Sequence, residues 1–298
     1  MFVNGVEVED TFCECFDVYF SRVVITAYNH CLAETAATEM TGFATSIIMC
    51  PAEAGIERKL GFDETPDGRA GVSVLICHPS KKSLQNQLIA RIGQCILTAP
   101  TANAFDGLED AEERFDAGNK LRYFGDGFER EVEVSGRKCW AIPIMEGDFI
   151  VENDFGIVKG IAGGNLFIMG ENQPSALSAA IAAVDSIRNM EGVITPFPGG
   201  IVASGSKVGA NRYTFLKATT NERYAPSLRG KVDLDIPENV NAIYEIVING
   251  LSEELVREAI KKCILSATKI PGVVKISAGN YGGKLGSCNI WLKDVVEE

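Results

Sequence analysis

One acidic residue interrupts an otherwise apolar strand pattern in the last fifth of the chain. Glu245 lies within AIYEIVI at residues 242–248, and in a strand its neighbours Ile243 and Val247 would share its face. Removing a carboxylate from water raises its pKa and favours the neutral acid. The pattern therefore predicts a carboxyl group that donates a hydrogen bond or a proton near neutral pH. A strand-edge glutamate whose carboxylate reaches water or a basic partner is the alternative.

Two similar turns supply a second group of candidates. Residues 41–57 read TGFATSIIMCPAEAGIE and residues 195–207 read TPFPGGIVASGSK, and a shift of 145 aligns Pro51 with Pro196. Small residues allow a ligand to approach the backbone closely. The binding candidates from both turns are Cys50, Pro51, Glu53, Gly55, Gly200, Ser204, Ser206 and Lys207. The serines and the lysine suit an anionic group, whereas purely structural turns with solvated glutamates are the alternative.

Other common kinds of site have little support. The glycine-rich segment 278–285 misses the spacing of a phosphate-binding loop. His30 and His78 are the only histidines, and the cysteines lack zinc-site spacing. Cys50 is the one thiol in a candidate site, where a small buried hydrophobic role is the better interpretation. We therefore expect no metal and no tightly bound cofactor.

Composition bounds the cellular setting. The 298 residues, 46% of them hydrophobic, suit two modest domains or one large one. A formal net charge of −12 opposes non-specific binding to nucleic acid. No apolar run approaches the roughly 18–20 residues of a membrane span, and MFVNGVEVED does not resemble a signal peptide. Nine scattered cysteines suit reduced thiols. We expect a cytoplasmic protein without nucleic-acid or membrane partners.

The elements that must position these residues occur twice. Each half shows a strand, a helix and a returning strand, then a strand and another helix. In the first half these lie at 22–27, 29–40, 43–49, 72–77 and 83–96; in the second they lie at 165–169, 174–190, 192–194, 244–248 and 252–265, with a closing strand at 272–277. The triplet Cys-Ile-Leu recurs at 95–97 and 263–265. This predicts an α+β fold, a duplicated ferredoxin-like (split β-α-β) sandwich with related lobes at 1–144 and 145–298.

Several strings, in their order along the chain, carry a family resemblance. They are VNGVEVEDTF from Val3, RIGQCILTAPT, PIMEGDF, TPFPGGIVASGSK, NAIYEIVING from Asn241, and AGNYGGKLG from Ala278. Over nearly its whole length the chain resembles formylmethanofuran:tetrahydromethanopterin formyltransferases, enzymes of archaeal and methylotroph one-carbon metabolism. The resemblance implies two related ferredoxin-like lobes and a catalytic glutamate at Glu245.

The resemblance also implies a reaction and an assembly. A formyl group would pass from formylmethanofuran to N5 of tetrahydromethanopterin, with both coenzymes acting as substrates. Neutral Glu245 would assist the oxyanion or the leaving amine, and amides near Gly55 and Gly200 would add donors. From the first turn itself, Glu53 and Glu57 are candidates to bind a pterin or an amine. A homo-oligomer, a tetramer built as a dimer of dimers, is expected. The alternatives are a subunit of a methylotroph formyltransferase/hydrolase complex and a non-catalytic pterin-binding or scaffold paralogue.

Overall fold

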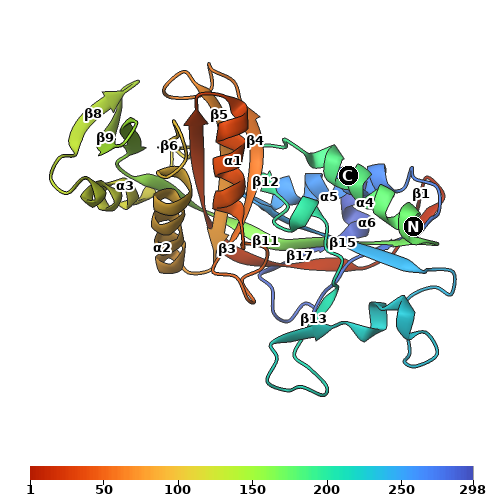
Figure 1. Ribbon diagram of the computed structural model, residues 1–298. Coiled ribbons are helices and arrows are strands. Elements are labelled where there is room, and N and C mark those ends of the chain that lie inside the picture. The colour runs from red at the N-terminus through yellow and green to blue at the C-terminus, as the bar shows by residue number, and fades with distance from the viewer. Residues whose placement is uncertain (298) are drawn as a thin grey trace. The chain divides into compact units, whose positions relative to one another are not determined.

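The structure is a computed structural model that describes residues 1–297, and it divides into two compact units (Figure 1). The N-terminal unit comprises Val18–Gly160 and Asn189–Pro196. The C-terminal unit comprises Met1–Asp17, Ile161–Arg188 and the chain from Phe197 onward. Two 16-residue strands, β3 (Phe12–Ala27) and β11 (Phe155–Gly170), contribute residues to both units. The lobe boundary between residues 144 and 145 stays a prediction.

The N-terminal unit contains a split β-α-β sandwich. Its strands are β3, β4 (Glu53–Leu60), β5 (Ala70–His78) and β6 (Asn103–Asp106). β3 pairs antiparallel with β5 and β6, and β4 pairs with β5, so the spatial order is β6-β3-β5-β4. Helices α1 (His30–Thr41) and α2 (Lys81–Arg91) pack against β5, and a π-helix (Ile92–Ile96) continues α2. This order is the ferredoxin-like one that the sequence predicts.

The prediction of a strand at residues 43–49 is wrong. Residues 42–50 form turns, in which Phe43 adopts a φ of 49°, and the returning strand β4 begins only at Glu53. The apolar residues 47–49 are exposed rather than buried. Buried Arg91 fixes the loop, because its guanidinium donates to the carbonyl oxygens of Gly42 and Phe43 at 2.9 and 3.4 Å. A side chain far along the sequence thus decides a local conformation that the apolar run alone predicted incorrectly.

The C-terminal unit repeats the topology around β11. β15 (Ala242–Gly250) and β16 (Val273–Ser277) pair antiparallel with β11 on its two sides. Helices α4 (Gln173–Ile187) and α5 (Glu253–Ala267) lie side by side over one face (Figure 1). On the side of β15 away from β11, Val202 and Glu245 form an isolated antiparallel bridge. The predicted α+β fold with two related split β-α-β lobes is confirmed.

Local sequence explains where these helices begin and end. Asn172 and Ser252 are N-caps whose side chains accept from the N–H of Ser175 and Leu255 at 2.9 and 3.3 Å. Helix α4 ends three residues before its predicted end at Met190. The reason is that the chain turns away there, with a φ of 65° at Asn189.

Small residues bring both helices close to the sheet. The buried alanines of α4 are Ala176, Ala179, Ala180 and Ala183. A Cβ at Gly164 of β11 would lie 2.6 Å from Cγ1 of Val256 on α5, so the glycine is required for this approach. Ile246 and Ile248 of β15 are fully buried on the helix-covered face. The odd-numbered side chains of β15, including Glu245, therefore lie on the opposite face.

The remaining elements extend the two units. In the C-terminal unit β1 (Phe2–Val3), β2 (Val6–Val8) and β17 (Cys288–Trp291) join the sheet edges, β13 (Ser206–Val208) and β14 (Ala218–Thr220) form a separate hairpin, and α6 (Leu292–Glu297) packs on α5. In the N-terminal unit the additions are β7 (Glu113–Phe115), α3 (Ala117–Leu121), β8 (Arg130–Val134), β9 (Arg137–Ile144), β10 (Gly147–Glu152) and β12 (Val193–Ile194). Among residues 1–297, no helix combines the length and apolarity needed to cross a membrane.

Candidate functional site

Glu245 lies in the middle of β15, with its backbone held from both sides. Phe167 of β11 is its cross-strand partner. On the other side the N–H of Val202 donates to the Glu245 carbonyl at 2.7 Å, and the N–H of Glu245 donates to the Val202 carbonyl at 3.0 Å. These pairings fix the backbone, so the side chain projects from the helix-free face in a defined direction.

The Glu245 carboxyl is almost without polar compensation. One hydrogen bond reaches it, from Nδ2 of Asn165 to Oε1 at 3.3 Å. Within residues 1–297, no lysine or arginine forms an ion pair with it. Desolvation raises the pKa of Glu245 to about 7, and the hydrogen bond from Asn165 opposes part of this rise. The group is thus an acid that exchanges its proton near neutral pH, as its apolar strand neighbours suggested.

Aromatic side chains surround this carboxyl on the same face. The ring of Phe167 packs against the ring of Tyr224, with centroids 4.9 Å apart. Close packing continues at Gly279, where a Cβ would lie 2.9 Å from Cζ of Phe167. Burial raises the pKa of the Tyr281 hydroxyl, and the charge of Glu245 adds to that effect. The face therefore offers flat apolar surface beside a single acid, an arrangement suited to a heterocyclic substrate.

The loop at residues 279–286 is fixed by a buried glutamate, Glu14. Both carboxylate oxygens of Glu14 accept backbone N–H groups, from Tyr281 at 2.7 Å, Gly283 at 3.0 Å, Leu285 at 2.5 Å and Gly286 at 2.6 Å. Burial acts to raise the pKa of Glu14, but the four hydrogen bonds outweigh it and hold the pKa below its usual value. The amides that a bound phosphate would need already donate to Glu14. This agrees with the sequence interpretation, in which the segment does not match a phosphate-binding loop.

Four of the predicted binding residues lie in the same unit as Glu245. Gly200, with a φ of 78°, is two residues from Val202, but its N–H already donates to the Phe197 carbonyl at 2.7 Å. The glycine is therefore explained by the turn, and its amide is not available as an oxyanion donor. Ser204 and Ser206 are exposed.

Lys207 is engaged by a neighbouring carboxylate. Its Nζ forms an ion pair with Glu222, whose other oxygen accepts from Nδ2 of Asn211 at 3.0 Å. The bond from Lys207 is the main cause that lowers the pKa of Glu222 to about 2. An anionic group that binds Lys207 must therefore compete with Glu222.

The other four predicted residues lie in the N-terminal unit. Cys50 is half-buried, and its Sγ lies 3.5 Å from Oγ1 of Thr45. Burial acts to raise the Cys50 pKa, yet hydrogen bonds from the Ser46 backbone and from Thr45 outweigh it and lower the pKa. Pro51 follows at the surface.

Glu53 and Gly55 have local roles in the same unit. Oε1 of Glu53 accepts from the N–H of Ile47 at 3.1 Å and so helps hold the 42–50 loop. Gly55 is buried in β4, and a Cβ there would lie 2.9 Å from Cβ of Ile194. Close packing inside the unit accounts for this glycine without a ligand.

Sequence reasoning missed Asn165, Phe167, Tyr281 and Glu14 as neighbours of the acid or its loop. For Asn165 a signal existed, because an amide within the apolar strand NLFIM is as unusual as Glu245 within AIYEIVI. For Glu14 the signal lay only in the fold, since its partners are about 270 residues away. The segment that contributes Tyr281 was noted for its glycines, and the tyrosine was passed over.

Other kinds of site are weakly represented in the described part of the chain. Residues 1–297 contain no group of three or more His, Cys, Asp and Glu side chains arranged to hold a metal ion. A cavity of about 220 Å³ is lined by residues of α5 and α6, among them Arg257 and Lys261. It belongs to the helical layer, which covers the face of the sheet opposite to Glu245.

Comparison with family models accounts for nearly the whole chain. The model described as formylmethanofuran-tetrahydromethanopterin formyltransferase matches residues 1–144. The model described as the proximal lobe of FTR matches residues 147–295.

Individual proteins show the same similarity. A formylmethanofuran–tetrahydromethanopterin formyltransferase from Archaeoglobus fulgidus is 66% identical over 296 residues, covering 99% of this chain and 100% of that protein. The solved formylmethanofuran:tetrahydromethanopterin formyltransferase from Methanosarcina barkeri is 58% identical, with a TM-score of 0.96 over 99% of this chain and all of that one. A chain of the formyltransferase/hydrolase complex from Methylorubrum extorquens in complex with methylofuran is 41% identical, with a TM-score of 0.94 over 100% of this chain and 99% of that one.

Proposed function

We propose that this chain, which belongs to the formylmethanofuran–tetrahydromethanopterin formyltransferase family, transfers a formyl group from formylmethanofuran to N5 of tetrahydromethanopterin. The observation that carries the proposal beyond similarity is the Glu245 carboxyl, whose pKa is raised to about 7 on an aromatic face. Both coenzymes act as substrates, and the reaction needs no tightly bound cofactor.

The chemistry is acyl transfer between two amines. N5 of the pterin attacks the formyl carbon, and negative charge develops on the formyl oxygen. Neutral Glu245 donates a hydrogen bond to that oxygen or a proton to the methanofuran nitrogen as the C–N bond breaks. The proton that N5 loses then restores the acid, so the enzyme ends each turnover unchanged. A pKa near 7 suits both halves of this exchange.

Two alternatives to an independent formyltransferase are a subunit of a larger complex and a non-catalytic paralogue. The Methylorubrum extorquens likeness supports the same transfer chemistry inside a larger complex, and its 41% identity lies below the 58% to the Methanosarcina barkeri enzyme. A non-catalytic pterin-binding paralogue would have no use for a poorly compensated acid in the middle of a strand. We therefore favour a catalyst that works without hydrolase subunits.

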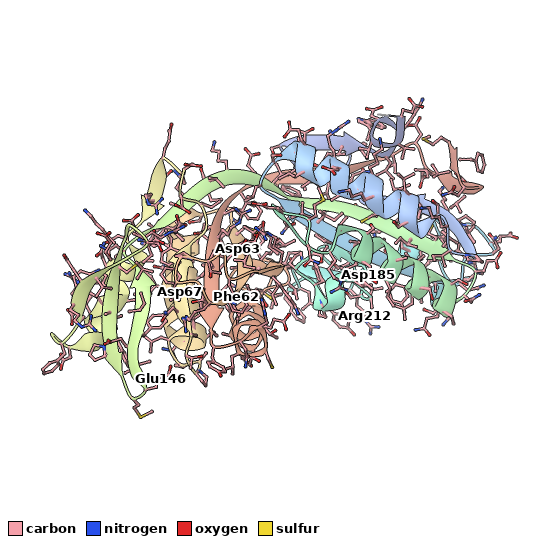
Figure 2. All side chains as sticks on the ribbon, turned by 90° about the horizontal axis from the view of Figure 1, so that it is seen from above. Phe62, Asp63, Asp67, Glu146, Asp185 and Arg212 are labelled. Carbon is pink, nitrogen blue, oxygen red and sulfur yellow. The ribbon has the colours of Figure 1, made fainter. Side chains whose placement is uncertain are left out.

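The proposal includes a cytoplasmic homo-oligomer, a tetramer assembled from dimers. All nine cysteines are free thiols, which suits a reducing compartment. Two exposed aromatic residues, Tyr213 and Phe215, lie in the loop that connects β13 and β14, directly after Arg212, which is labelled in Figure 2. A contact there between copies would bury them. Because each copy carries a net charge of −12, salt should strengthen association. Sedimentation across a salt series tests this, and a monomer at every salt concentration contradicts it.

The test of the function is a transfer assay with the purified chain and both coenzymes. Loss of formylmethanofuran and appearance of the 5-formyl pterin are followed together by chromatography. We expect equal amounts of the two, with no added partner protein and no inhibition by a chelator. Binding of the pterin without transfer would support the non-catalytic paralogue instead. Activity that appears only with added hydrolase subunits would support the complex.

A further inference from the structure

The side chain of Asn165 has a fixed orientation because its two ends meet different partners. Its Oδ1 accepts from the backbone N–H of Gly279 at 2.8 Å. A backbone N–H can only donate, so the amide oxygen must face Gly279. The amide nitrogen then faces Glu245, with Nδ2 at 3.3 Å from Oε1. Unlike a hydroxyl, this nitrogen is only a donor, so it always requires an accepting oxygen on the glutamate.

This requirement distinguishes the two oxygens of Glu245. When the carboxyl is neutral, the donor favours Oε1 as the carbonyl oxygen, which is the stronger acceptor, and so favours the proton on Oε2. When the carboxyl is ionised, the same hydrogen bond stabilises the charge. A donor that favours the charged form lowers the pKa and so limits the rise caused by desolvation.

We propose that Asn165 is a positioning residue for formyl transfer, which keeps Oε1 of Glu245 as the acceptor and thereby places the transferable proton on Oε2. The proposal rests on the proposed function. The side chain of Asn165 also links Glu245 to the loop at residues 279–286, because its oxygen accepts from the Gly279 N–H. The same loop donates backbone N–H groups to Glu14.

Few other titratable groups face the acid, and one is Tyr224, which packs on Phe167 and whose pKa burial raises. The loop contributes Tyr281, whose pKa burial raises, and Glu14, whose carboxylate is occupied by four backbone amides. On β16 the charged residue is Lys275, which pairs with Glu7 and Glu9 at 3.6 and 3.2 Å. β11 presents Asn165, Phe167 and Met169 on this face, and the segment around Val202 has no ionisable side chain. Asn165 is therefore the side chain best placed to tune Glu245.

Two substitutions separate positioning from loop support. Asn165→Asp has nearly the same shape and keeps an oxygen for the Gly279 N–H, but it cannot present the amide donor to Glu245. Asn165→Ala removes both contacts. Asn249→Ala is the matched control, because Asn249 is on the same face of β15 and its Oδ1 accepts from the Gly163 N–H at 3.0 Å. All three are measured as pH profiles of kcat and kcat/KM, with Glu245→Gln as the reference that lacks the acid.

In the native chain, activity should fall as pH rises through the pKa of Glu245. Both Asn165 variants should move this alkaline limb to higher pH and lower kcat at neutral pH by about tenfold, the usual effect of losing one hydrogen bond to a charged group, with KM nearly unchanged. Asn249→Ala should leave the limb in place. An unmoved limb in Asn165→Asp would overturn the proposal and leave loop support as the role of this residue.

A second readout does not depend on turnover. Infrared difference spectra between the native chain and Glu245→Gln report the carboxyl titration directly, and the same comparison in the Asn165→Asp background should show a titration at higher pH. If the native chain transferred no formyl group while this shift occurred, the proposed function would fail and the positioning would stand. An identical titration in both backgrounds would reject the positioning whatever the activity.

Discussion

Glu57 and Glu245 are glutamates on strands of the two related units, and their surroundings are opposite. Glu57 lies where a bulge interrupts the register of β4, and it is 3% exposed. Its carboxylate receives Nη2 of Arg22 at 2.6 Å, the hydroxyl of Ser73 and the N–H of Gly192. Glu245 receives only the amide of Asn165. One fold thus encloses a fully compensated carboxylate in one unit and a nearly uncompensated acid in the other.

The difference separates a structural charge from a reactive one. A buried carboxylate that accepts from an arginine and two further donors has its hydrogen-bonding capacity satisfied, and it becomes part of the packing. A half-buried, desolvated carboxyl with one weak donor keeps a pKa near the pH at which it must work. The sequence interpretation that gave Glu57 a binding role does not fit its three partners. The interpretation of Glu245 as an acid with a raised pKa does fit a carboxyl that has Asn165 as its single hydrogen-bond partner.

The largest expected effect is on turnover. Glu245→Ala should lower kcat by about two to three orders of magnitude, since it removes the acid from the developing charge. If Glu245 delivers a proton, Glu245→Gln should lose about two to four orders of magnitude, because an amide cannot deliver one. If Glu245 only hydrogen-bonds the oxyanion, the Gln variant should keep much of its activity. Steady-state rates distinguish these roles, and near-native rates in both variants would remove Glu245 from the mechanism.

The next effect is on stability and concerns Glu57. Glu57→Gln leaves the half-buried Arg22 guanidinium without its nearest counter-charge and should lower the free energy of unfolding by about 3–5 kcal/mol. The partly exposed pair of Arg22 with Glu191, at 3.5 Å, compensates little. Urea unfolding measures the loss. A variant as stable as the native chain would show that the contrast between the two glutamates is mistaken.

Glu245→Gln should have the opposite effect on stability. The folded-state pKa of about 7 lies above the ordinary value of 4.5, so folding penalises the ionised form. The penalty is absent below the unfolded-state pKa, grows as pH rises from 4.5 to about 7, and is constant above. Glu245→Gln should therefore stabilise the chain above pH 7 by at most about 3 kcal/mol and have little effect near pH 4. Equal effects at both pH values would contradict a raised pKa.

A smaller effect on stability is expected when Glu14 is substituted. Its folded-state pKa is lowered, so its contribution to stability is present above the unfolded-state value and is lost as pH falls through the folded-state value. Glu14→Gln should loosen the loop at residues 279–286 by about 1–2 kcal/mol, because an amide cannot accept from all four N–H groups. Hydrogen exchange of the Tyr281 and Gly283 amides should quicken in the variant at neutral pH. Unchanged exchange would show that the loop is held by other contacts.

Local patterns predicted much of the fold because the duplication forced each pattern to be satisfied twice. The helix starts near residues 29 and 252 and the strand around Glu245 were predicted correctly from residue type and period. The strand expected at 43–49 failed because Arg91, about 50 residues later, holds those carbonyls in turns. The division of the chain within β3 and β11 was not predictable either. The sequence of a continuous strand does not show where one unit ends and the other begins.

For the candidate site, residue type identified the acid but not its partners. Glu245 was conspicuous because a charge in an apolar strand is costly. Asn165 is 80 residues earlier and Gly279 lies 114 residues beyond Asn165, so only the pairing of β11 with β15 and the path after β16 bring them together. Gly55 and Gly200 were expected to serve a ligand, and packing or turn geometry accounts for both.

The central claim is that Glu245 remains a neutral acid up to about pH 7. Infrared difference spectroscopy of the native chain against Glu245→Gln, recorded across a pH series, isolates the carbonyl stretch of this one protonated carboxyl. The account predicts a band that is present at pH 5 and disappears with a midpoint near pH 7. A band that has already vanished near the ordinary glutamate pKa of 4.5 would contradict it.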